Sequence, residues 1–183
     1  MTSGARLWYK PRVHSSAKPL RKRASYATDA VKRVLLLEDD LDLRLLLEGY
    51  LEAYFYRVTT VTSGVDGLNA ILNADFDVIL CDMLMPKMRG DMFYYAVQRV
   101  KPQLCERFIF ITANGESARV HEFLNQVSGM VLIKPFHLDD LLETILLLFR
   151  DLECSTNKLV APNDPFAPAP GPPPATRPRG RPA

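Results

Sequence analysis

Three carboxylates follow directly on an apolar run near the start of the chain. The run Val34–Leu37 has the composition of a short buried strand, and Glu38, Asp39 and Asp40 come immediately after it. Like charges at this spacing repel one another, and carboxylates at the edge of a core are poorly solvated. The stretch therefore indicates either acids that lie harmlessly in water at the start of a helix, or a site that holds a positive charge.

Further polar residues stand at the ends of later apolar runs. Asp82 follows "FDVILC", Thr112 ends "RFIFIT" and Lys134 follows "MVLI". If these runs are parallel strands of one sheet, their carboxyl ends meet at the edge where ligands bind. Oxygen ligands alone suit a hard cation such as Mg²⁺, which takes one or two carboxylates and keeps several waters. The ammonium of Lys134 and the hydroxyl of Thr112 would then receive an anionic group.

An alternation of strand and helix patterns must position these residues. Strand patterns cover 34–37, 57–61, 76–81, 107–112 and 130–133, and helical patterns cover 41–54, 63–74 with a Ser63 cap, 92–100, 116–127 and 138–152. Five strand–helix units in about 120 residues predict a doubly wound α/β fold with a parallel sheet and right-handed crossovers. No glycine-rich phosphate loop is present, which disfavours a nucleotide-binding fold.

Four motifs in this order identify a family. They are "VLLLEDD", "DVILCDMLMPKMRG", "FIFITA" and "VLIKPF". On these motifs the chain from about Lys32 to Leu152 resembles the receiver domain of two-component response regulators, of the single-domain, chemotaxis-regulator type. The resemblance implies a flavodoxin-like five-stranded parallel sheet with the strand order 2-1-3-4-5.

The resemblance also assigns chemistry to the acids. Asp82 matches the phosphoacceptor, which takes its phosphoryl group from a histidine kinase or a phosphotransfer protein. Asp39 would bind Mg²⁺ directly and Glu38 through water. Asp82 itself and the backbone carbonyl of Leu84 would complete the protein's ligands to the metal.

The remaining matched positions concern the phosphoryl group and the switch. Thr112, with Ala113 beside it, would follow the phosphoryl group, and Lys134 would bind it ahead of a cis Pro135. The family usually has an aromatic residue three positions before this lysine, and this chain has Val131 there. The resemblance therefore does not extend to the aromatic part of the switch.

Composition divides the chain into three parts. The net charge of +2 combines +6 in residues 1–30, −6 in residues 31–160 and +2 in residues 161–183. We expect a basic disordered arm over 1–30, a receiver domain over 31–153 and a Pro-rich disordered tail over 154–183. The arm could bind nucleic acid, an acidic partner or anionic lipid, or serve as a transit peptide; the tail could bind a proline-recognising domain or act as a spacer.

Other features limit the class of protein. The content of 48% hydrophobic residues suffices for a globular core, and no apolar run has the length of a membrane span. No secretory signal is evident, and the three cysteines, Cys81, Cys105 and Cys154, lack the spacing of metal ligands. Together these features predict a cytoplasmic protein.

The sequence therefore predicts a phosphorylation-dependent signalling switch rather than an enzyme. The residues after Leu152 are few and Pro-rich, so we expect no DNA-binding output domain and signalling through contacts with a downstream protein target. One alternative is a receiver-like interaction module that is never phosphorylated. A phosphatase of the haloacid-dehalogenase type is disfavoured, because Leu84 stands where that chemistry needs a second aspartate.

Overall fold

The strands form one parallel sheet. The computed structural model describes residues 31–113 and 118–159. The strands are β1 (Arg33–Leu37), β2 (Arg57–Val61), β3 (Val78–Asp82), β4 (Phe108–Thr112) and β5 (Met130–Ile133). They pair in the order β2-β1-β3-β4-β5, every pair parallel. The predicted fold class and strand order are confirmed.

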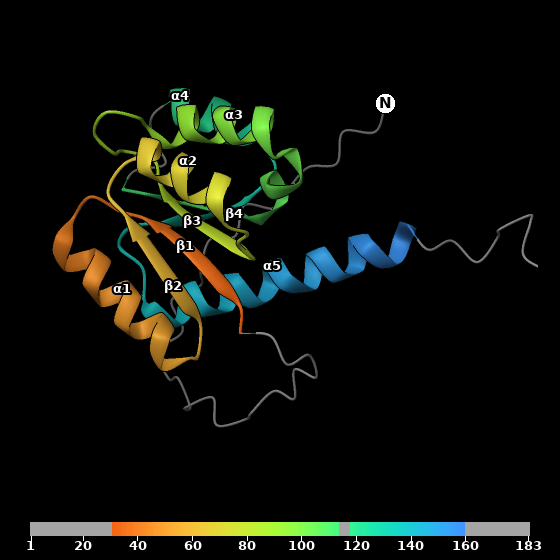
Figure 1. Cartoon of the computed structure of the whole chain (residues 1–183), viewed down its shortest axis with the longest axis horizontal. Helices are drawn as coiled ribbons and strands as arrows, with labels where there is room; N and C mark the ends of the chain where they lie inside the picture. The colour runs from red at the N-terminus through yellow and green to blue at the C-terminus, as the bar shows by residue number, and fades with distance from the viewer. Residues whose placement is uncertain (1–30, 114–117, 160–183) are drawn as a thin grey trace, which may run out of the picture.

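Helices cover both faces of this sheet (Figure 1). They are α1 (Leu41–Ala53), α2 (Gly64–Asn73), α3 (Gly90–Val100), α4 (Ala118–Gln126) and α5 (Leu138–Leu159), with a short 3₁₀ helix, η1, at Pro102–Arg107. In Figure 1, α2, α3 and α4 lie on one face, and α1 and α5 lie on the other. The result is a three-layer α/β fold.

The alternation of side chains along each strand builds two cores. In β1, Val34 and Leu36 pack under α1 and α5, while Leu35 and Leu37 pack under α2, α3 and α4. All four side chains are fully buried, as expected for a central parallel strand that is covered on both faces. The apolar run that precedes the acids is therefore a fully buried strand that fixes their position.

The core under α3 and α4 is rich in aromatic rings. Tyr94 of α3 lies 5.1 Å from Phe108, 5.7 Å from Phe110 and 5.6 Å from Phe123 between ring centroids. Ring pairs at these separations attract one another beyond the gain from burial. This cluster joins α3, β4 and α4, and it lies towards the amino end and the middle of β4, because Phe108 is the first residue of that strand.

Several element boundaries differ from the sequence-based prediction. Helix α3 begins at Gly90, in a segment predicted as a loop, and η1 was not predicted. Helix α5 continues to Leu159, past residue 154, where the sequence-based prediction starts the tail. The cause is local composition, because "ECSTNKL" contains neither glycine nor proline and the Pro-rich sequence begins only at Pro162.

The predicted basic arm and most of the Pro-rich tail lie outside the described residues, as does the first part of the helix predicted over 116–127. Within 31–113 and 118–159, no helix has the length and apolar character that crossing a bilayer requires.

Candidate functional site

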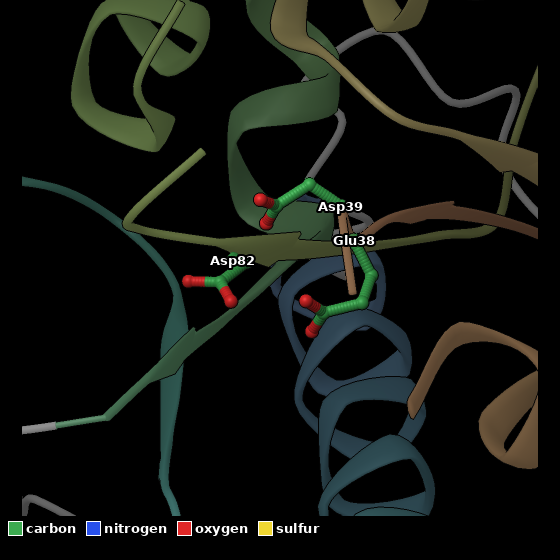
Figure 2. A group of neighbouring side chains, drawn as sticks. All are labelled: Glu38, Asp39 and Asp82. Atoms are coloured by element: carbon green, nitrogen blue, oxygen red, sulfur yellow. The ribbon is translucent and has the colours of Figure 1, made fainter. Parts of the chain in front are cut away.

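Three carboxylates gather at the carboxyl edge of the sheet. Glu38 and Asp39 follow the end of β1, and Asp82 is the last residue of β3. The two strands pair with Leu37 opposite Cys81, which sets the next residues, Glu38 and Asp82, side by side. Carboxylate oxygens of all three acids lie within 4.8 Å of one another, and Figure 2 shows the side chains together.

Two of these acids are buried and one is exposed. Glu38 is 1% exposed and Asp82 is 5% exposed, whereas Asp39 faces solvent. Burial raises the pKa of Glu38; a hydrogen bond from Lys134 opposes this effect, and the charge of Asp82 adds to it. The site thus holds two closely spaced carboxylates where water screens them poorly.

Lys134 lies between the two buried acids. Its Nζ donates hydrogen bonds to Oε2 of Glu38 at 2.9 Å and to Oδ2 of Asp82 at 2.6 Å. Burial alone would lower the pKa of Lys134, but the hydrogen bonds and charges of Asp82 and Glu38 outweigh that effect and raise it. The ammonium therefore stays charged and balances one of the two buried negative charges.

The acid that follows this pair in sequence has a different role. Asp40 caps α1, because its Oδ1 accepts a hydrogen bond from the backbone N–H of Leu43 at 3.0 Å. Its own N–H donates to Oε1 of Glu38 at 3.3 Å. Arg44 steadies the same turn by donating to the backbone carbonyls of Glu38 and Asp39. The run of three acids thus supplies two site carboxylates and one helix cap.

The loop after β3 orients Asp82. The backbone N–H of Leu84 donates to Oδ1 of Asp82 at 2.8 Å, while the Leu84 side chain is exposed. Gly90, which sequence reasoning left without a role, starts α3 against the same residue. A Cβ at Gly90 would lie 2.7 Å from the backbone oxygen of Asp82, so only glycine permits this approach. A glycine near the start of a helix after a site residue is the signal that could have identified it.

The predicted phosphate-binding and switch residues lie at the ends of β4 and β5. Thr112 is buried one position beyond Ile111, which pairs with Asp82, and its carbonyl accepts from the N–H of Lys134 at 2.8 Å. Ala113 is exposed, and the peptide bond between Lys134 and Pro135 is cis. The structure therefore brings Thr112 and Lys134 to the same edge as the acids.

Val131 lies away from this edge. It pairs with Phe110 in the sheet and packs, half-buried, against the core under α3 and α4. In this pair the aromatic residue is Phe110 of β4, and the β5 residue is a valine.

The donor set suits a hard divalent cation. All side-chain donors are carboxylate oxygens, and an ion with metal–oxygen distances of about 2.1 Å holds its ligand oxygens at most about 4.2 Å apart. The observed spread, within 4.8 Å, requires only small side-chain adjustments to meet that limit. The same edge also presents an oriented carboxylate, on Asp82, and an ammonium that can pair with an anion.

Comparison with known proteins agrees with this arrangement. A model of the response regulator receiver domain matches residues 34–146. The response regulator receiver protein CpdR of Brucella abortus (strain 2308) is 34% identical over 115 residues, which cover 63% of this chain and 94% of CpdR. The transcriptional regulatory protein RprY of Bacteroides fragilis (strain YCH46) is 29% identical over 130 residues, which cover 71% of this chain and 54% of RprY. The chain thus spans nearly all of one relative and about half of the other.

A solved structure shows the same fold. A CheY-like response regulator receiver domain protein from Methanospirillum hungatei JF-1 superposes with a TM-score of 0.63 at 27% identity, covering 69% of this chain and 99% of that protein. The segment matched by the family model contains the three clustered acids, Thr112 and Lys134.

Proposed function

The chain belongs to the response regulator receiver family, and on this premise we propose that it is a phosphorylation-dependent switch of a two-component phosphorelay. Asp82 is the proposed phosphoacceptor. The observation that carries the proposal is the position of this buried carboxylate, which one amide and one ammonium orient beside two further acids. A histidine kinase or a phosphotransfer protein is the proposed donor.

The proposed reaction is an in-line transfer from a phosphohistidine. An oxygen of Asp82 bonds to phosphorus as the bond between phosphorus and the donor's imidazole nitrogen breaks, and the imidazole keeps that electron pair. Lys134 turns from the carboxylates to an oxygen of the phosphoryl group. The chain contributes mainly positioning and charge neutralisation, which is how proteins assist phosphoryl transfer.

Mg²⁺ is the proposed cofactor. Glu38, Asp39, Asp82 and the backbone carbonyl of Leu84 are the residues that would hold it. When bound, it supplies positive charge to the phosphoryl oxygens. The excess of carboxylates over ammonium groups at this edge supports the assignment, because Lys134 alone cannot balance the three acids.

The acyl phosphate formed on Asp82 carries more negative charge than the carboxylate and offers new hydrogen-bond acceptors. In the proposal, Thr112 and Ala113 respond to it at the end of β4 and pass the change to the surface near α4 and β5. The signal then reaches a downstream protein through surface contacts. Val131 has no part in this proposal beyond packing.

The test is intact-mass spectrometry after incubation with acetyl phosphate and Mg²⁺. We expect the native chain to gain one phosphoryl group, Asp82→Asn to gain none, and EDTA to abolish the gain. Asp91→Asn is the matched control and should gain the group, because Asp91 is a third buried carboxylate, outside the cluster but close to the same edge. A phosphoryl group that persists in Asp82→Asn would show that the acceptor is another residue.

The second candidate is an interaction module that works without phosphorylation. Val131, in place of the family's usual aromatic, is the observation that favours it. Absence of any phosphoryl gain, with acetyl phosphate and with a protein phosphodonor, would decide for this candidate.

A further inference from the structure

Helix α1 exposes an apolar face that no described part of the chain covers. Leu41, Leu45 and Leu46 are 56%, 55% and 53% exposed, although Leu47 and Leu51 already supply this helix with a fully buried face. A Cβ placed on Gly49, one turn after Leu45, would meet nothing within 4 Å among the described residues. We call Leu41, Leu45, Leu46 and Gly49 the α1 ridge. A surface helix needs one apolar face for its core, so a second one indicates a partner.

Acids border the α1 ridge. Helix α1 contains Asp42, Glu48 and Glu52, and its single basic residue is Arg44. Arg44 is engaged below the ridge, where its guanidinium donates to the carbonyls that follow β1. The complementary partner is therefore an apolar segment flanked by basic residues.

The chain contains a segment of that kind in its basic arm. Residues 6–12 read "RLWYKPR", with Leu7, Trp8 and Tyr9 between basic residues. We propose that this segment docks on the α1 ridge of the same molecule. Aromatic side chains supply the largest contact area at an interface, and Gly49 leaves room in the ridge for a ring to approach the helix backbone.

The entry point of the arm favours this intramolecular contact. The backbone N–H of Arg57, shortly after the end of α1, donates to the carbonyl of Lys32 at 2.9 Å. The arm therefore joins the domain beside the C-terminal end of α1. About 20 residues separate this segment from Lys32, and a chain of that length reaches at most about 65 Å, whereas α1 is about 20 Å long. Such a tether gives a local concentration on the order of 1 mM, so a contact of low intrinsic affinity is substantially formed.

The α1 ridge adjoins the site without being part of it. Leu41 follows Asp39 and Asp40 directly, so the first turn of the ridge lies next to the site carboxylates. The docking itself does not depend on the phosphorylation proposed for Asp82.

Trp8 is the only tryptophan of the chain, so its fluorescence reports the arm alone. Acrylamide quenching would be measured on the full-length native chain, Leu45→Lys and Leu72→Lys. Leu72 is the matched control, because it is 56% exposed but lies on α2, across the sheet. With the arm docked about half of the time or more, the quenching constant should be at least about twofold larger in Leu45→Lys than in the native chain. Leu72→Lys should equal the native chain.

Charge reversal gives a second variant that leaves the apolar residues in place. Glu52→Lys should also increase quenching, and 1 M NaCl should increase it in the native chain because salt screens the acids. Equal quenching in the native chain and Leu45→Lys would overturn the proposal. So would an equal increase in Leu72→Lys, or protection of Trp8 that rises with protein concentration, which would assign the ridge to a second copy.

Discussion

Residue

One ammonium group stands between two buried carboxylates at the site. Lys134 bonds to Glu38 and Asp82 at once, and both acids are almost completely buried. Removing one partner of a buried ion pair lowers the free energy of unfolding more than removing one partner of an exposed pair. The reason is that the charge left behind in the buried case is neither paired nor hydrated. Without a cation, Lys134 therefore contributes to the stability of the domain as well as to its proposed chemistry.

The corresponding variant is Lys134→Ala. We expect it to lower the free energy of unfolding by about 2–4 kcal/mol in EDTA, measured by urea denaturation. Lys101→Ala is the control, because Lys101 pairs with the exposed Asp75, and such surface pairs contribute at most about 1 kcal/mol. Similar small losses in both variants would contradict the structural role of Lys134.

The cysteines differ sharply in accessibility. Cys81 and Cys105 are buried, and burial raises the pKa of both thiols, more strongly for Cys81. Cys154 is exposed on α5. We expect iodoacetamide to add one group to the native chain, at Cys154, and three groups in denaturant, as read by mass spectrometry. Cys154→Ser should leave the native protein unlabelled, and labelling of Cys81 would show that the core opens on the timescale of the experiment.

Prediction from sequence succeeds for some site residues and fails for others. Glu38, Asp82 and Lys134 lie where the rule for strand ends places them, because parallel strands of similar length end at one edge. The sequence did not show which acids of "EDD" lie at the site and which one caps the helix. The turn after β1 makes Asp40 the cap of α1. The bridging contact of Lys134 with both acids could not be predicted either, because it depends on the distance in space between strands that are far apart in sequence.

Element

The end of α1 has an unusual residue in a left-handed conformation. Phe55 has φ 66° and is 86% exposed. Its N–H donates to the carbonyl of Glu52 at 2.9 Å, and the N–H of Tyr56 donates to the carbonyl of Leu51 at 3.2 Å. These two bonds form a Schellman motif, whose left-handed position normally holds glycine. A bulky residue here costs conformational energy and gains no burial.

Phe55→Gly should therefore stabilise the protein. The left-handed strain of about 1–2 kcal/mol is relieved, and the greater freedom of glycine in the unfolded chain offsets about half of the gain. We expect a net increase of about 0.5–1 kcal/mol in the free energy of unfolding, from urea titrations. Phe55→Ala removes the ring but keeps the Cβ, so it should show little increase; an equal increase in both variants would assign the effect to the exposed ring.

Elements were predictable where a pattern repeats and less so where a boundary depends on contacts. The strands are evident from short apolar or β-branched runs, and Ser63 caps α2 as predicted, accepting from the N–H of Asp66. The start of α3 at Gly90 could not be predicted from a capping residue. Arg89 occupies the cap position and makes no side-chain capping bond, so the sequence carries no capping signal there. The 3₁₀ helix after α3 is too short for periodicity to show.

Whole molecule

The carboxylate cluster links metal binding to the stability of the whole domain. A cation that binds the folded chain but not the unfolded chain raises the free energy of unfolding by about 1.4 kcal/mol at ten times its dissociation constant. We therefore expect Mg²⁺ to raise the thermal midpoint relative to EDTA at equal ionic strength, by differential scanning fluorimetry. Asp82→Asn should lose most of this shift. Asp77→Asn should keep it, because the Asp77 carboxylate accepts hydrogen bonds from the Lys32 side chain and the Arg33 backbone N–H and is not part of the cluster. An equal shift in both variants would place the cation elsewhere.

The order of the strands along the chain separates the two buried site acids from their counter-ion. Strand β1 pairs with β2 on one side and β3 on the other, so the half of the sheet that carries Glu38 and Asp82 is complete at residue 82. Lys134 follows β5, the last strand of the chain to be synthesised among those described. Any assembly of β1 with β3 that lacks β5 therefore holds two adjacent acids without the ammonium, and the docking of β5 completes the site and relieves their repulsion.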